Sequence, residues 1–213
     1  MPYNDASHQS TSGLHALLST PWVYQLSQII MGIRRLMHRL VHDHIQPQPG
    51  HHILDIGCGP ADILAILPKN VHYTGYDLDP NYIAVAQRRF GARGQFLNER
   101  FDQYTVISSS QKYDRVLAIG FLHHVSDESA HNFFKAAKNA LAPGGKVITI
   151  DICHTPHQPW YIRALNNMDR GRHVRNAGQY KALATGIFSE IRQTLRDDLL
   201  YIPRYLLVQE CFP

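Results

Sequence analysis

The sequence has few cysteines, and they form no pairing pattern. Cys58, Cys153 and Cys211 are odd in number, lie far apart and include no CxxC pair. Disulfide-stabilised domains and zinc sites need cysteines at short, regular spacing, so this pattern argues against both and favours a reducing compartment. We therefore expect a cytoplasmic protein whose site holds no metal.

Long apolar runs and long runs of like charge are also absent. No apolar stretch approaches the length of a membrane span, and no basic-then-apolar signal segment opens the chain. The formal net charge is +4, with 18% charged and 44% hydrophobic residues, and no long Lys/Arg tract occurs. This basic balance permits an anionic partner without requiring one. The 213 residues are expected to form one globular domain, 1–213, with a sizeable core.

What the sequence does have is a glycine-rich loop directly after a short apolar run. Residues 52–62 read His-Ile-Leu-Asp-Ile-Gly-Cys-Gly-Pro-Ala-Asp. Gly57 and Gly59 remove two Cβ atoms where the chain must turn and let a ligand approach. Asp55 places a carboxylate at the end of the expected strand, the edge at which parallel sheets bind ligands. Such a carboxylate favours a cationic or hydroxyl-rich ligand and disfavours a phosphate.

Known nucleotide-binding patterns narrow the class of ligand. The dinucleotide fingerprint requires Gly where Asp62 stands, and the P-loop requires Gly-Lys-Ser/Thr, which does not occur here. Asp77 ends a second apolar run, about twenty residues further on, where an acidic side chain binds ribose hydroxyls. The combination indicates a nucleoside that carries no phosphate.

These motifs resemble those of the class I S-adenosylmethionine-dependent methyltransferases. The resemblance covers residues 53–62, 75–80, 113–125 and 141–151, in order and over roughly half the chain. It implies S-adenosyl-L-methionine as cofactor and S-adenosyl-L-homocysteine as product. It also implies a Rossmann-like α/β fold, with a doubly wound, mostly parallel sheet and a C-terminal antiparallel hairpin. Two positions depart from the family pattern: Ala61 replaces the last glycine of the loop, and Arg100 stands where an Asp often lies near the adenine.

The resemblance also implies a set of cofactor-binding residues. They are Asp55, Gly57, Gly59, Asp77, Leu78, Arg100, Phe101 and Ala118. Phe101 is expected to stack on the adenine and Arg100 to lie over its face. An alternative stays open for this pair, with Phe101 in the core and Arg100 in a solvated loop.

Hydrophobic periodicity predicts the order of the elements. Helices are expected over 21–45, 62–67, 79–91 and 127–141, and strands over 53–56, 71–77, 95–98, 113–119, 146–151, 188–195 and 205–211. Strands that alternate with helices form a parallel sheet with right-handed crossovers. Residues 1–49 are expected to form an N-terminal helical cap, and about 152–187 a substrate-lid insertion. The basic face of the 21–45 helix permits peripheral membrane contact, although an apolar stripe packed on its own domain is the commoner arrangement.

Two histidines follow the fourth expected strand, where the family's acceptor meets the methyl group. Methyl transfer needs a base only when the acceptor must lose a proton, and a neutral imidazole suits that task near pH 7. We expect His123 or His124 to be catalytic, with a preference for His123. The alternative is that one of them packs on the following helix and caps a carbonyl.

The expected lid contains a cluster of arginines, Arg170, Arg172 and Arg175. Guanidinium groups match carboxylate or phosphate oxygens, so we expect one or two of these arginines to bind an anionic acceptor. Asp151, at the end of the fifth expected strand, is expected to orient the substrate or a histidine. The alternative is a surface loop whose arginines pair with nearby aspartates, while Asp151 only caps its own loop.

The leading hypothesis is an S-adenosylmethionine-dependent methyltransferase with a small or lipid-linked, anionic substrate. An RNA methyltransferase and a cofactor-binding protein without catalysis are the alternatives. Nucleic acid is the less favoured partner, because residues 118–121 lack the Asn/Asp-Pro-Pro-Tyr/Phe motif of base amino methylation and no Pro-Cys pair occurs. The atom that is methylated and the oligomeric state are left open.

Overall fold

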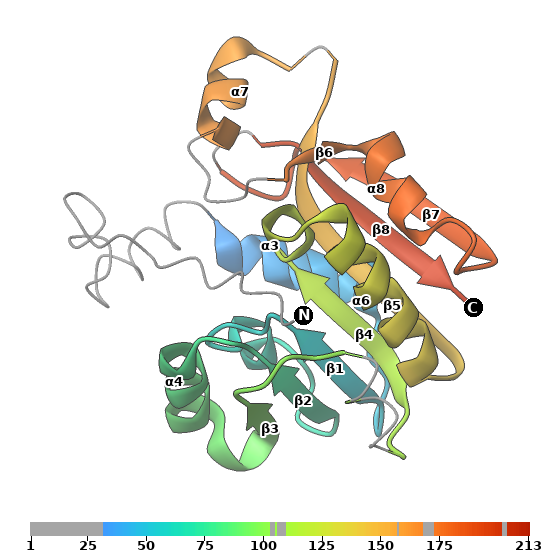
Figure 1. The fold of residues 1–213 in the computed structure, drawn as a ribbon. Helices are drawn as coiled ribbons and strands as arrows, with labels where there is room; N and C mark the ends of the chain where they lie inside the picture. The colour runs from blue at the N-terminus through green and yellow to red at the C-terminus, as the bar shows by residue number, and fades with distance from the viewer. Residues whose placement is uncertain (1–31, 103–104, 106–109, 157, 168–172, 202–203) are drawn as a thin grey trace.

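The computed structural model describes residues 32–102, 105, 110–156, 158–167, 173–201 and 204–213 (Figure 1). A mixed sheet crosses the molecule in the strand order β3-β2-β1-β4-β5-β8-β7, and β6 pairs with β5 off this path. The strands are β1 (His52–Ile56), β2 (His72–Tyr76), β3 (Gly94–Leu97), β4 (Tyr113–Ile119), β5 (Leu141–His154), β6 (Arg175–Asn176), β7 (Glu190–Arg196) and β8 (Leu206–Phe212).

The first part of the sheet is parallel and its C-terminal part is antiparallel. Strands β1 to β5 pair in parallel, β8 runs antiparallel to β5, and β7 runs antiparallel to β8. This arrangement confirms the expected Rossmann-like sheet with its antiparallel hairpin. Strand β5 begins earlier than expected, because Leu141 pairs with Tyr113 before the register shifts.

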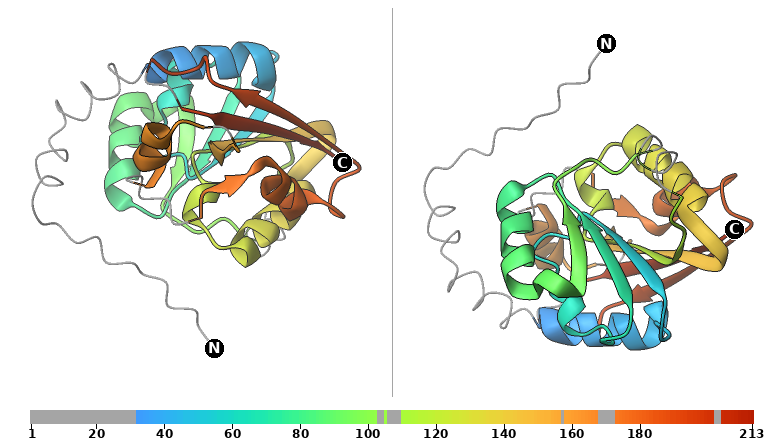
Figure 2. Two further views of the ribbon diagram at one scale, coloured as in Figure 1. Left: turned by 90° about the horizontal axis from the view of Figure 1, so that it is seen from above. Right: turned by 90° about the horizontal axis from the view of Figure 1, so that it is seen from below.

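Helices cover both faces of the sheet (Figure 2). The helical segments are α3 (Ile33–Leu40), η1 (Val41–Ile45), η2 (Asp62–Ala65), α4 (Pro80–Phe90), η3 (Gly91–Arg93), η4 (Leu122–His124), α6 (Asp127–Ala140), α7 (Trp160–Asn167) and α8 (Ala177–Ala184). Side chains of α3, η2 and α4 pack in one apolar cluster, whereas those of α6 and α8 pack in the other. None of the helices formed by the described residues is long and apolar enough to cross a membrane.

Local sequence explains where several of these helices begin. Asp79 accepts a hydrogen bond from the Asn81 amide, with Pro80 in the first turn of α4, and Ser126 caps α6 in the same way. The prediction of a helix over 62–67 was too long, since only the short 3₁₀ segment η2 forms there. The part of the 21–45 helix that lies within the described residues is helical, and its last five residues form a π-helix. Helices α7 and α8 were not predicted.

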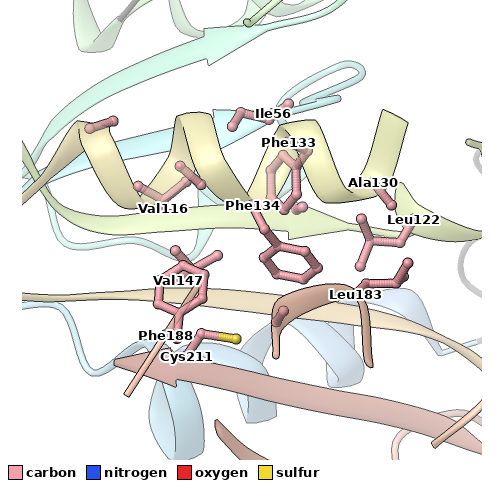
Figure 3. Close-up of a cluster of buried hydrophobic side chains, with 14 of the residues drawn as sticks. Ile56, Val116, Leu122, Ala130, Phe133, Phe134, Val147, Leu183, Phe188 and Cys211 are labelled. Atoms are coloured by element: carbon pink, nitrogen blue, oxygen red, sulfur yellow. The ribbon is translucent and has the colours of Figure 1, made fainter. Parts of the chain in front are cut away.

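Aromatic residues of α6 form the centre of one apolar cluster. Figure 3 shows Phe133 and Phe134 between α6 and the sheet, with Val116, Val147 and Phe188 around them. Phe134 is fully buried, and its ring meets Phe188 edge-on at 6.0 Å between centroids. Both side chains therefore face inward from the helix that the sequence predicts over 127–141. All three cysteines are free and buried.

Candidate active site

The glycine-rich loop turns sharply at the C-terminal end of β1. Gly57 and Gly59 have φ angles of +70° and +53°, a region that side chains rarely adopt. A Cβ atom on Gly57 would lie 2.9 Å from Cδ2 of Phe121, so the loop is also closely packed. Ala61 has a φ of +57°, so this departure from the family pattern keeps the left-handed backbone at a cost of about 1 kcal/mol.

Asp77 connects this loop to the end of β2. Its Oδ2 accepts a hydrogen bond of 2.8 Å from the Gly59 amide, and its Oδ1 accepts one of 2.8 Å from the Asp79 amide. Each carboxylate oxygen has capacity for a further hydrogen bond. Asp77 therefore orders the loop and still has acceptor capacity for hydroxyl groups.

Asp55 is a buried carboxylate at the base of the loop, only 2% exposed. Its Oδ2 accepts a hydrogen bond of 2.7 Å from the Tyr73 hydroxyl, whereas its Oδ1 has no partner among the described residues. Burial raises the pKa of Asp55 to about 7, with Asp77 adding to the rise and the Tyr73 hydrogen bond opposing it. Such a group is stabilised by a cationic or hydrogen-bond-donating ligand.

A cavity of about 260 Å³ joins the loop to the ends of β4 and β5. Its polar lining includes Asp55, Asp62, His123 and Asp151. Its apolar wall comes from α3, through Ile33, Leu36 and Met37, and from Ile119, Ile150, Ile152 and Leu206 of the sheet. The cavity therefore places buried acids and a histidine opposite an aliphatic wall.

His123 and Asp151 form a buried pair in this cavity. The Asp151 Oδ1 accepts hydrogen bonds from the His123 amide at 3.1 Å and from its Nδ1 at 2.8 Å. Asp151 Oδ2 has no partner in the described part of the chain. Burial raises the pKa of Asp151, and the His123 hydrogen bond opposes that rise. A proton on Nδ1 makes Nε2 the basic nitrogen of the neutral ring.

Comparisons with known proteins agree with this geometry. Residues 54–147, which contain the loop, Asp77 and His123, match the family model described as a methyltransferase domain. Phosphoethanolamine N-methyltransferase 1 of Arabidopsis thaliana is 32% identical over 165 residues, which are 71% of this chain and 33% of that protein. The phosphoethanolamine N-methyltransferase of Triticum aestivum is 27% identical over 175 residues, 76% of this chain and 34% of that protein. The chain thus spans about a third of the length of these relatives.

A comparison with solved structures finds the same fold. The crystal structure of the S-adenosylmethionine-dependent methyltransferase SibL, in its apo form, matches with a TM-score of 0.69 at 19% identity. The match covers 94% of this chain and 59% of that one. The family match makes residues 54–147 of this chain a domain of the class I S-adenosylmethionine-dependent methyltransferases. Family membership makes S-adenosyl-L-methionine the cofactor against which the residues of the cavity can be tested.

The residues of this family member fit that cofactor. S-adenosyl-L-methionine carries an amino group, a positively charged sulfur and ribose hydroxyls. Oδ1 of Asp55, which no described residue contacts by a hydrogen bond, suits a cationic group, and the open acceptor capacity of Asp77 suits hydroxyls. The side chains that would hold the cofactor are therefore present at the loop.

Asp77 is not among the residues that line the cavity, although it is hydrogen-bonded to Gly59, which is, and four further predicted cofactor residues also lie outside the lining. Ala118 is fully buried in the core, and its neighbours Ile119 and Gly120 line the cavity instead. Phe101 meets Tyr76 edge-on at 5.5 Å and packs against the core, as the alternative reading of the sequence had it. Leu78 is 61% exposed, and Arg100 is also exposed. The lining side chains of α3 and Gly120 were not among the predicted site residues, although the sequence predicted a helical cap over 1–49 and Gly120 directly follows the fourth expected strand.

The remaining predicted catalytic and substrate-binding residues differ in where they lie. His124 is exposed beside His123, with ring centroids 4.1 Å apart, and does not line the cavity. Arg170 and Arg172 lie outside the described residues.

Arg175 is buried, and all its donor groups are engaged by the protein. It binds the Leu122, Val125 and His173 carbonyls and the Asp127 carboxylate at 2.6 to 3.0 Å. This arrangement argues against the substrate-binding role expected from the sequence.

Proposed function

We propose that this chain transfers the methyl group of S-adenosyl-L-methionine to a small or lipid-linked, anionic acceptor by in-line displacement. The observation that carries the proposal is the His123–Asp151 pair, which shares one cavity with Asp55 and the glycine-rich loop. A base and a cofactor-binding loop in one cavity support a transfer reaction more than binding alone.

The chemistry divides between the cofactor and the protein. S-adenosyl-L-methionine supplies a methyl group that is bonded to a positively charged sulfur. That sulfur is already a good leaving group, and it departs as the thioether of S-adenosyl-L-homocysteine. The loop, Asp55 and Asp77 would hold the cofactor, while the aliphatic wall excludes water from the reacting atoms. His123 would take the acceptor's proton on Nε2, and Asp151 would hold the ring in the required tautomer.

The relatives suggest the kind of acceptor. Their names identify phosphoethanolamine as substrate, a molecule with both an amine and a phosphate. Asp151 Oδ2, which has no partner among the described residues, would accept a hydrogen bond from an amine or hydroxyl of the acceptor. Arg170 and Arg172 remain candidates for its anionic group. Helix α7 and the segment around it would form the lid of the acceptor site.

The proposal is tested by label transfer from methyl-tritiated S-adenosyl-L-methionine. The protein is incubated with a cell extract that contains soluble and membrane fractions, and in parallel with phosphoethanolamine and with phosphatidylethanolamine vesicles. Label in the small-molecule or organic-extractable fraction is expected. Label that RNase removes would instead support an RNA methyltransferase, and cofactor binding without label in any fraction would favour a binding protein without catalysis. The matched control is Asp77→Ala, which should lose cofactor binding and label together.

A further inference from the structure

Large aromatic side chains are exposed at one end of the molecule. Trp160 is 81% and Tyr161 is 47% exposed at the start of α7, and Tyr201 is 64% exposed in the segment before β8. The rings of Trp160 and Tyr161 meet edge-on, with centroids 6.2 Å apart. A group of exposed aromatic side chains marks an interaction surface, whereas single ones are ordinary.

Topology brings these side chains to the end of the sheet that carries the cavity. Helix α7 follows the C-terminal end of β5, and Tyr201 precedes β8, whose Leu206 pairs with Ile152 near that end. Figure 1 shows α7 and the red segment before β8 at the same upper end of the molecule. The Tyr201 ring also lies against Gly32, at the start of α3, which provides the aliphatic wall of the cavity.

Positive charge accompanies the aromatic side chains. Arg163 is exposed on α7, and Arg35 is exposed on α3 with its guanidinium carbon 5.7 Å from the Tyr201 ring centroid. Neither arginine forms an ion pair with any residue that the structure describes. Of the nearby acids, Asp197 is exposed, whereas Asp198 is bound by Arg196 at 2.6 Å. We call Trp160, Tyr161, Arg163, Tyr201 and Arg35 the aromatic–basic rim.

The start of α7 holds its aromatic residues outward. Ile162 is only 3% exposed and attaches the helix to the body of the protein. The turn before it is fastened by a hydrogen bond of 2.9 Å from the Thr155 amide to Gln158 Oε1. Because the inner face is packed in this way, the side chains of Trp160 and Tyr161 stay in solvent.

We propose that the aromatic–basic rim docks this protein on the surface of an anionic membrane. Trp and Tyr have an apolar body and a polar tip, which suits the headgroup region of a bilayer, and arginines are attracted to anionic lipids. Single-stranded nucleic acid fits less well, because it requires a row of open aromatic faces along a charged groove. The inference extends the proposed function: it places the cavity end of the molecule against lipid, where a lipid-linked acceptor is reached.

Vesicle flotation of the full chain tests the proposal. Vesicles of phosphatidylcholine alone are compared with vesicles that also contain phosphatidylserine, at low and high salt. The protein is expected to bind the anionic vesicles and to be released by salt. Trp160→Ser should weaken binding about tenfold, because much of an aromatic surface no longer enters the bilayer. Arg163→Gln should weaken it about fivefold, as expected for one surface charge.

The control variants make the same kinds of substitution at positions outside the aromatic–basic rim. Tyr82→Ser removes a partly exposed aromatic residue from α4, and Arg192→Gln removes an exposed charge from β7. Both should bind vesicles like the wild type. Equal binding by all variants, binding that ignores phosphatidylserine, or binding to single-stranded RNA that the rim variants lose would overturn the proposal. S-adenosyl-L-methionine binding is measured by calorimetry on each variant, so a failure of the proposed function is distinguished from a failure of docking.

Discussion

Two buried carboxylates dominate the site at the scale of single residues. Asp55 and Asp151 are each 2% exposed, and in each one oxygen is hydrogen-bonded while the other has no partner among the described residues. A buried acceptor without a partner costs stability, since water no longer satisfies it. This cost is offset when a ligand supplies the missing donor, so these residues connect stability to binding.

The first prediction concerns Asp55→Asn. At pH 8 the variant should be more stable to unfolding than the wild type by about 1–3 kcal/mol, because no buried charge remains. The pKa of Asp55 is about 7 in the folded protein and 3.8 in its ordinary state, so the unfolded chain loses the proton more readily. The contribution of Asp55 to the free energy of unfolding of the wild type therefore falls as pH rises from about 4 to 7. Urea unfolding at pH 5 and pH 8 measures the difference.

The same variant should bind S-adenosyl-L-methionine at least about tenfold more weakly at pH 8, because a carboxylate that stabilises a cationic group is lost. Calorimetry measures this affinity. Glu128→Gln, an exposed change on α6, is the control and should alter neither property. An Asp55→Asn variant with wild-type pH dependence would show that the carboxyl is not buried as an anion.

The second prediction separates a base from a positioning residue. His123→Asn should lower kcat about 10²- to 10⁴-fold on an acceptor that must lose a proton, with cofactor affinity within about twofold of wild type. Asp151→Asn should lower kcat less and move the acidic limb of the pH–rate profile to lower pH, because the carboxylate that favours protonated imidazole is removed. His124→Asn is the control. Initial rates across pH measure all three, and equal losses for both histidines would contradict the assignment.

At the scale of elements, Arg175 holds the segment between β4 and α6 in place. It reaches from β6 to the Leu122 and Val125 carbonyls around η4 and to Asp127 at the start of α6. These contacts support the turn that carries His123. A residue from the expected substrate lid thus supports the turn that carries the proposed base, although the sequence suggested that it binds substrate.

The third prediction follows from that role. Arg175→Met should destabilise the fold by about 2–4 kcal/mol, because it leaves buried carbonyls without donors. Urea unfolding measures the loss, and Arg192→Met, an exposed change on β7, should cost under about 0.5 kcal/mol. A raised KM for an anionic acceptor with unchanged stability would instead return Arg175 to substrate binding.

At the scale of the whole molecule, the C-terminal hairpin is joined to the segment that follows α3. Glu210 on β8 accepts hydrogen bonds from His44 at 3.1 Å and from Lys146 at 2.6 Å. Burial would raise the pKa of Glu210, but the hydrogen bonds from His44 and Lys146 lower it overall. The last strand is therefore bonded to η1 and β5, so the wall of the cavity depends on the C-terminal hairpin.

The fourth prediction tests this connection. Glu210→Ala should destabilise the protein by about 3–5 kcal/mol, because the Lys146 charge stays buried without its partner. Since the pKa of Glu210 is lowered, its contribution is present above pH 4.5 and is lost as pH falls below that value. Unfolding at pH 7 and at acid pH should therefore show a smaller difference between wild type and variant in acid. Glu190→Ala, an exposed change, is the control, and an equal effect would refute the connection.

Local sequence patterns were enough to predict the sheet and the cofactor loop. Strand β4 ends where the sequence placed it, at Ile119, because a short apolar run and the glycine after it are properties of neighbouring positions. Gly57 and Gly59 come from a short motif whose left-handed backbone favours glycine, and Asp77 was placed by its position directly after the second apolar run. For the same reason Asp55 could be assigned to the cavity before any contact was known.

The roles of the other site residues depend on contacts between segments that are distant in the sequence. The hydrogen bond to Asp151, on β5, distinguishes His123 from its neighbour His124. Arg175 donates its hydrogen bonds to carbonyls about fifty residues earlier in the chain, which argues against a role in substrate binding. Ala118 faces the core while Ile119 lines the cavity, because side chains alternate across a strand and only packing shows which face meets the ligand. The sequence by itself thus determined the family and the cofactor loop, whereas the surroundings of each candidate catalytic side chain required the tertiary structure.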